Sequence, residues 1–123
     1  MARTFPRLAL LPALLLAACG GAVTQEDFAA QYAPLWCDQQ RSCALGAYES
    51  EFRDKDDCET SVQEDKETES EANDAAGCAF DADEAEACLA AIREASCEDW
   101  YEGEVEEDCA EVWTCAGGSD SGR

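Results

Sequence analysis

The cysteines are the residues of this chain with the widest chemical repertoire. Nine occur among 123 residues, and Cys19, close to the N-terminus, stands apart from the other eight. An even number of cysteines in a small exported domain is typical of a disulfide framework. We therefore expect up to four disulfides, formed among Cys37, Cys43, Cys58, Cys78, Cys88, Cys97, Cys109 and Cys115.

The spacing of these cysteines does not select their partners, because eight cysteines allow roughly a hundred connectivities. Short loops cost the least entropy to close. This favours the pairings Cys43–Cys58 and Cys78–Cys88, with the other connectivities left open.

Two pairs of cysteines are six residues apart, Cys37 with Cys43 and Cys109 with Cys115. On one helix this spacing is a rotation of about 240°, so the two side chains face apart. A bridge within either pair is therefore disfavoured. Cys37 is instead placed to join the first predicted helix to the last one, through Cys109 or Cys115.

The rest of the sequence lacks several residue types and motifs on which enzymes commonly depend. There is no histidine, which removes the commonest general base, the triads built on it and the zinc sites that use it. The chain also lacks Cys-x-x-Cys, a glycine-rich phosphate loop and a Gly-x-Ser-x-Gly motif. We predict a protein that is not an enzyme, with no catalytic residues and no cofactor.

Acidic residues supply most of the charge: 29 Asp and Glu stand against eight Lys and Arg, a net charge of −21. The runs at 54–57 and 81–84 concentrate acids as calcium loops do. An EF-hand loop also needs Gly at its sixth position and Glu at its twelfth, and neither run has these residues there. We predict no dedicated metal site, weak binding of divalent cations, and a helix-capping role for these acids.

The same charge limits the classes of partner. Nucleic acid is excluded because its phosphates are repelled, whereas a basic protein or peptide is electrostatically favoured. Aromatic side chains dominate interface energetics, and the candidate binding aromatics are Trp100, Tyr101 and Trp113, together with Trp36. Burial in the core is the alternative for each of them.

The first 18 residues have the layout of a secretory signal peptide. Arg3 and Arg7 make a basic start, residues 8–16 are an apolar run, and Ala17 and Ala18 are small. The apolar run is too short for a membrane-spanning helix, which needs roughly 20 apolar residues. The leader therefore predicts export of the chain.

The end of the leader, Leu16-Ala17-Ala18-Cys19, resembles the lipobox of bacterial lipoproteins, and the chain looks like a small cysteine-rich member with no assigned activity. The resemblance implies cleavage before Cys19 and several acyl chains on that residue, palmitate among them. Two or more chains give stable membrane anchoring. Gly20 replaces the Asp that often retains such proteins at the inner membrane, which favours the outer membrane, at its periplasmic face or at the cell surface.

These features divide the chain into four parts. We expect a removed signal peptide at 1–18, a lipidated tether at 19–23, a cysteine-rich helical domain at 24–116 and a flexible tail at 117–123. The expected function is that of a lipid-anchored, non-enzymatic cell-envelope lipoprotein that binds or adapts a protein partner. The alternative is an acidic surface module that binds cations such as calcium.

The pattern from residue 24 onward predicts a small all-α, disulfide-rich domain of three or four short helices, with strand signals nearly absent. Thr24 and Asp81 begin two helices, since each is followed three residues later by an acid, as in a capping box. Gly46 is expected to end the first. The expected helices cover 24–45, 58–73, 82–97 and 106–114, and the expected loops cover 46–57, 77–80 and 98–105.

Replacement of the lipidated cysteine tests the anchor. The variant Cys19→Ser should appear in the soluble fraction after cell lysis, because it lacks the thiol that carries the first acyl chains. Immunoblots of membrane and soluble fractions measure this, and Cys115→Ser, which leaves the lipobox intact, is the control. A Cys19→Ser protein that stays in the membrane fraction contradicts the anchor.

Overall fold

The computed structural model of the protein describes residues 22–116. The predicted signal peptide at 1–18, the predicted lipidation site Cys19 and the predicted tail at 117–123 lie outside the described residues. No helix among the described residues has both the length and the apolar character needed to cross a bilayer. The elements are α1 (Gln25–Cys43), α2 (Leu45–Glu51), α3 (Lys55–Ala75), β1 (Ala79–Phe80), α4 (Ala82–Glu94), α5 (Cys97–Glu102), α6 (Glu104–Cys109) and β2 (Trp113–Thr114).

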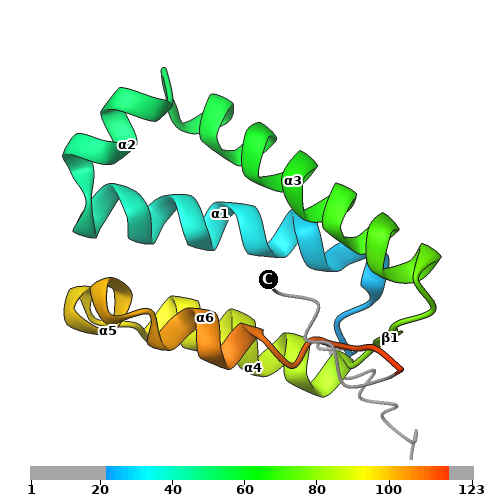
Figure 1. Cartoon of the computed structure of the whole chain (residues 1–123). Coiled ribbons are helices and arrows are strands. Elements are labelled where there is room, and N and C mark those ends of the chain that lie inside the picture. The colour runs from blue at the N-terminus through cyan, green and yellow to red at the C-terminus, as the bar shows by residue number, and fades with distance from the viewer. Residues whose placement is uncertain (1–21, 117–123) are drawn as a thin grey trace, which may run out of the picture.

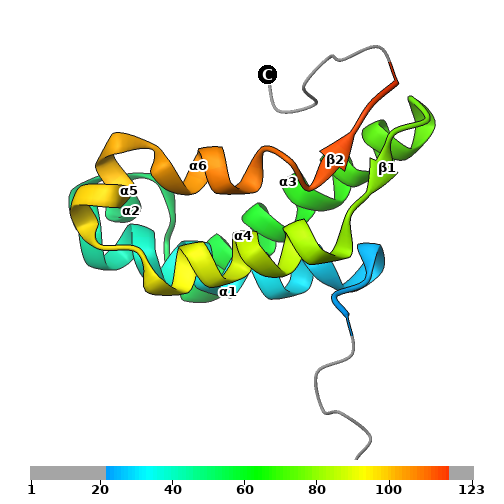
Figure 2. The same cartoon turned by 90° about the horizontal axis from the view of Figure 1, so that it is seen from below.

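Helix α1 lies between the other helices (Figure 1). On one side it packs against α2 and α3, and on the other against α4 and α5, with α6 packed on α4. The two short strands pair antiparallel, with Ala79 opposite Thr114 and Phe80 opposite Trp113. They lie near the N-terminal end of α1, and α2 and α5 lie at its other end (Figure 2).

Polar side chains cap α1, α3 and α4 as the sequence predicts. Thr24 accepts a hydrogen bond from the backbone N–H of Asp27 at 3.2 Å, and Asp81 accepts one from that of Glu84 at 3.0 Å. Asp54 caps α3 in the same way, so the acidic run at 54–57 starts a helix. Each cap satisfies a backbone donor that the first turn leaves free.

The segment expected to be a loop at 46–57 is largely helical, and this expectation was wrong. Gly46 lies inside α2, and the helix break falls at Ala44, whose φ is −138°. The cause is burial, because Tyr48 of α2 and the following Phe52 pack against the buried Cys37 of α1 and Cys58 of α3. A seven-residue helix is marginal alone, so tertiary packing decides this segment.

The connection expected at 98–105 is also mostly helical, and the expected final helix at 106–114 is shifted. Ser96 and Asp99 form a complete capping box that starts α5, and Gly103, with φ +77°, separates α5 from α6. Helix α6 ends at Cys109, and Trp113 pairs with β1 instead of continuing it. The helical, disulfide-rich class is confirmed, and the described chain contains six helices.

All eight expected cysteines are paired in four disulfides. The two pairings favoured by loop length were wrong, and so was the expected bridge from Cys37 to Cys109 or Cys115. Tertiary packing sets the partners instead. Three bridges join helices that pack together, and Cys78–Cys115 lies beside the paired strands β1 and β2. The absence of a bridge between Cys37 and Cys43, and between Cys109 and Cys115, is as predicted. The observed disulfides are Cys37–Cys58, Cys43–Cys97, Cys78–Cys115 and Cys88–Cys109.

The apolar core is divided into two clusters. The larger one centres on Leu89 and Ile92 of α4. It also contains residues of α1, of α6 and of the strand region. The smaller one joins α1, α2 and α3, and half of its buried members are the bonded Cys37 and Cys58. Cysteine thus replaces the large aliphatic side chains that this chain lacks.

Reduction of the four disulfides should unfold the domain. Each bridge contributes about 2–4 kcal/mol, mainly by restricting the unfolded chain, and the buried cysteines leave a thin core without them. Far-ultraviolet circular dichroism and thermal melting, with and without a phosphine reductant, measure the effect. An unchanged spectrum and midpoint in fully reduced protein would falsify this account of the stability.

Candidate functional site

A cleft of about 410 Å³ lies where α1, α3 and the α5–α6 segment meet. Helix α1 forms its floor with Tyr32 and Trp36, and α3 provides one wall with Lys66 and Glu69. Trp100 and Glu106 come from the opposite wall. The cleft therefore combines aromatic rings with carboxylates from three separate segments.

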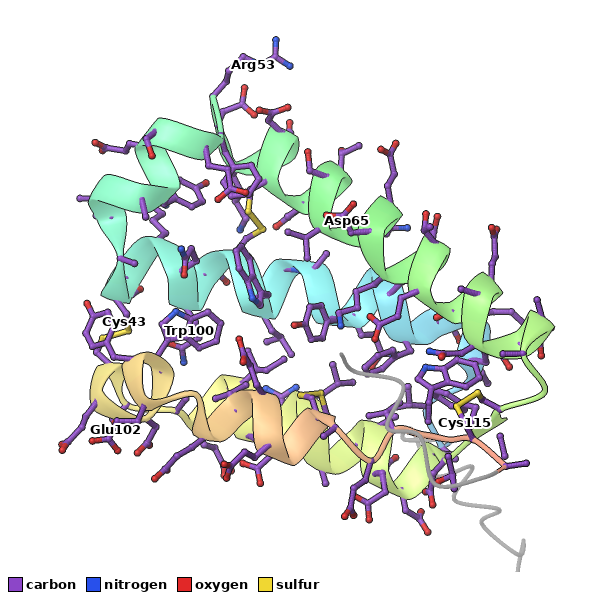
Figure 3. The ribbon with its side chains drawn as sticks, viewed as in Figure 1. Cys43, Arg53, Asp65, Trp100, Glu102 and Cys115 are labelled. Carbon is purple, nitrogen blue, oxygen red and sulfur yellow. A yellow bond between two sulfur atoms is a disulfide. The ribbon has the colours of Figure 1, made fainter. Side chains whose placement is uncertain are left out.

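Two tryptophans form the aromatic part of the cleft. The ring centroids of Trp36 and Trp100 are 5.9 Å apart, with the planes inclined at 60°, and both side chains are only partly buried. The indole Nε1–H of Trp100 donates a hydrogen bond to Gln40 Oε1 at 2.9 Å. Figure 3 shows Trp100 extending from α5 toward α1. Its ring is thus held in place before any ligand arrives.

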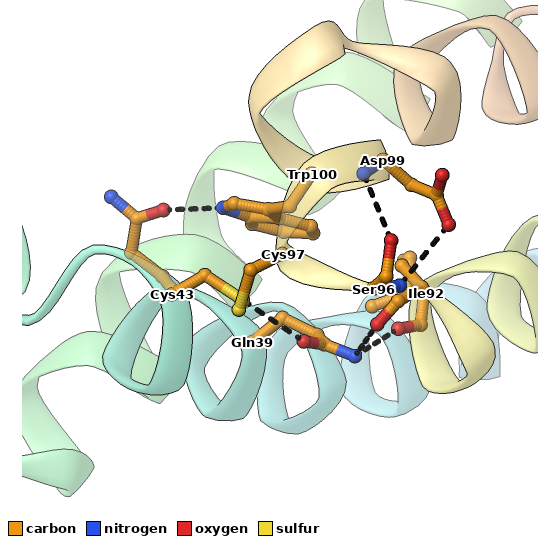
Figure 4. Close-up of a disulfide and its surroundings, with 9 residues drawn as sticks. Gln39, Cys43, Ile92, Ser96, Cys97, Asp99 and Trp100 are labelled. Atoms are coloured by element: carbon orange, nitrogen blue, oxygen red, sulfur yellow. Dashed lines mark hydrogen bonds between the residues drawn. A yellow bond between two sulfur atoms is a disulfide. The ribbon is translucent and has the colours of Figure 1, made fainter.

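The backbone that carries Trp100 is tied to α1 by covalent and polar contacts (Figure 4). The Cys43–Cys97 disulfide joins the end of α1 to the start of α5. The Gln39 amide donates hydrogen bonds to the carbonyl oxygens of Ile92, at 2.7 Å, and Ala95, at 3.2 Å, at the end of α4. These links fix the position of α5, and with it one wall of the cleft.

The charged part of the cleft centres on Tyr32. Lys66 Nζ lies 4.5 Å from the centroid of the Tyr32 ring and 2.7 Å from Glu69 Oε2. Burial raises the pKa of the Tyr32 hydroxyl well above its usual range, and the negative charges of Glu69 and Glu106 raise it further. Both carboxylates therefore lie near enough to the Tyr32 hydroxyl to raise its pKa, although they come from α3 and α6.

The predicted binding aromatics do not form one surface. Trp100 lines the cleft, whereas Tyr101 is 67% exposed and does not line it. Trp113 is buried, with its ring centroid 5.3 Å from that of Phe80. Trp36, the fourth candidate, lines the cleft with Trp100. The sequence did not identify Glu69 and Glu106 as site residues, because nothing in it distinguishes these two from the other acids.

The acidic runs considered for calcium have structural partners. Asp54 and Asp81 cap helices, and Asp57 forms an ion pair with Arg53 at 3.2 Å. Across residues 22–116 there is no group of three or more His, Cys, Asp or Glu side chains arranged to hold a metal ion. No observation on the described residues therefore specifically supports the calcium-binding alternative.

Comparison of the chain with protein-family models, with curated proteins and with solved structures finds no match. The chemistry of the cleft is then the guide to what the domain binds. Aromatic faces and carboxylates both attract cations, so the arrangement suits a positively charged organic group.

The neighbouring carboxyl groups of Asp99 and Glu104, beside the cleft wall, shift each other's pKa. Hydrogen bonds from Ser96 lower the pKa of Asp99 below its ordinary 3.8, whereas the Asp99 carboxylate, which favours a protonated Glu104, raises the pKa of Glu104 above its ordinary 4.5. Stabilisation from Asp99 is present above pH 3.8 and is lost as the pH falls through its lowered pKa. Stabilisation from Glu104 is present below pH 4.5 and is lost as the pH rises through its raised pKa.

Glu104→Gln should therefore raise the melting temperature at pH 7, because the amide keeps a donor for Asp99 and removes the repelling charge. The gain should shrink as the pH approaches 4.5, where Glu104 is increasingly protonated in the wild type. Thermal melts across this range measure it. The control Glu86→Gln removes one exposed charge from α4, and an equal gain in both variants would attribute the effect to net charge alone.

Proposed function

We propose that this chain is a lipid-anchored lipoprotein of the bacterial cell envelope, attached through acyl chains on Cys19. Its location is the outer membrane, at the periplasmic face or the cell surface. Its helical domain is a non-enzymatic binding or adaptor module for a protein partner. The observation that carries the binding role is the cleft lined by Trp36 and Trp100.

The chemistry of the domain supports an envelope location. Four disulfides suit an oxidising compartment and persist poorly in a reducing cytosol. The buried Val23 follows Cys19 by four residues, a span of at most about 14 Å. The start of the domain would thus sit close to the lipid surface.

The geometry of the cleft supports a binding role. Tryptophan is enriched among the residues that contribute most to interfaces, and here two indoles are partly exposed in one concave site. The hydrogen bond from Trp100 to Gln40 and the Cys43–Cys97 disulfide hold the wall in place. Such preorganisation lowers the entropy lost on binding.

Chemical crosslinking of the lipidated full-length protein in intact cells tests the function. Crosslinked partners should be recovered with the wild type and reduced by about tenfold or more in Trp36→Ala and Trp100→Ala, the scale of a central interface residue. Tyr101→Ala is the matched control, since this exposed ring neighbours Trp100 in sequence and lies outside the cleft lining. Circular dichroism confirms that each variant is folded. If recovery is the same for the wild type and both tryptophan variants, the cleft is not the binding site.

A further inference from the structure

An ammonium group already occupies part of the cleft. Lys66 extends from α3 so that its Nζ lies over the Tyr32 ring, 4.5 Å from the centroid, and 2.7 Å from a Glu69 oxygen. Its side chain is 25% exposed. A cation is therefore held here by a ring face and a carboxylate together, which are the two groups that recognise cationic side chains in proteins.

The remainder of the cleft offers the same chemistry without a cation. Within residues 22–116, no lysine or arginine lies within salt-bridge distance of Glu106. The Trp36 and Trp100 rings are partly exposed beside it, and the indole N–H of Trp100 is already satisfied by Gln40. Trp100 thus presents an apolar, electron-rich ring face rather than a hydrogen-bond donor.

We propose that this part of the cleft binds an arginine or lysine side chain from a basic segment of the partner protein. The inference rests on the proposed binding role and names the chemistry of the partner. The cationic group contacts Glu106 and the faces of Trp36 and Trp100, and Lys66 competes with it for Glu69. The net charge of −21 steers a basic segment toward the domain.

Charge complementarity argues against the other occupants of such a cleft. A second copy of this chain would bring another net charge of −21 against an acidic surface, so self-association there is unfavourable. A bare divalent cation prefers several oxygen ligands, whereas the lining has two carboxylates, and Lys66 already binds one of them. A side chain that joins a positive head to an apolar stem fits both parts of the cleft.

Fluorescence titration of the oxidised, full-length protein in nonionic detergent tests the proposal. The probes are three short peptides of identical Gly-Ser background that carry arginine, lysine or the neutral isostere citrulline. The arginine or lysine peptide should change the tryptophan emission, and the citrulline peptide should not. Equal binding of the citrulline peptide would overturn the proposal.

Matched variants separate the cleft from diffuse attraction to an acidic protein. Glu106→Gln should weaken peptide binding by about tenfold, as expected for loss of one charge-assisted hydrogen bond, while Glu107→Gln should not. Lys66→Gln should tighten binding by roughly threefold, the scale of one exposed salt bridge, because it frees Glu69. Lys55→Gln removes the same charge away from the cleft lining and should change little. Equal effects within either pair would overturn the proposal.

Two further results distinguish this inference from the binding role on which it rests. If no cationic peptide binds, and crosslinking in cells still depends on Trp36 and Trp100, the cationic chemistry is wrong and the binding role stands. If crosslinking does not depend on these tryptophans, the cleft is not the binding site, and the inference fails together with the proposed role of the cleft. Sedimentation of the full-length protein tests whether a second copy of the chain occupies the cleft. A dimer that is abolished by Trp100→Ala would place a second copy there and overturn the proposal.

Discussion

Repulsion among acidic side chains is the constraint that shapes this fold. A chain of 123 residues with a net charge of −21 favours expanded conformations, and few large aliphatic side chains are present to oppose it. Cross-links change this balance because they remove extended conformations from the unfolded state. Cys37, Cys58 and Cys88 are at most 1% exposed, so the same residues also fill space in the core. The disulfides therefore serve both as chain constraints and as apolar volume.

Helix α1 distributes these constraints to the rest of the domain. Cys37 links it to α3, and Cys43 links it to α5. Gln39, between them, binds the carbonyl groups at the end of α4. Because α3 and α6 flank α1 on different sides, Tyr32 and Trp36 are left at the bottom of a cleft. The candidate site is thus a direct consequence of how the helices are joined.

Some of the acidic side chains stabilise the helices of the fold. Asp54 and Asp81 satisfy backbone donors at helix N-termini, and further acids occupy the first turns, where they interact favourably with the helix dipole. Glu69 and Glu106 differ from these acids because both line an aromatic cleft, although Glu106 also lies in the first turn of α6. Their placement is the basis for assigning a cationic partner to the domain.

Several properties followed from local sequence. Capping residues at Thr24 and Asp81 located two helix starts, the even set of cysteines indicated four disulfides, and sparse strand signals indicated a helical class. The lipobox at 16–19 stays a prediction. Local signals were insufficient for α2 and α5, since a short helix depends on what it packs against, as Tyr48 of α2 does.

Tertiary structure alone decided the disulfide partners and the cleft. Cys43 pairs with Cys97 across 54 residues because helix packing, and not loop length, brings their Cα atoms within bonding reach. Trp36, Glu69 and Glu106 come together for the same reason. Nothing in the sequence around either glutamate marks it, and only the packing of α3 and α6 around α1 places both beside Tyr32. The sequence by itself determined which helices and cross-links this chain can form, and the three-dimensional packing determined which of its many acids share a site, because that depends on distances between segments far apart in the chain.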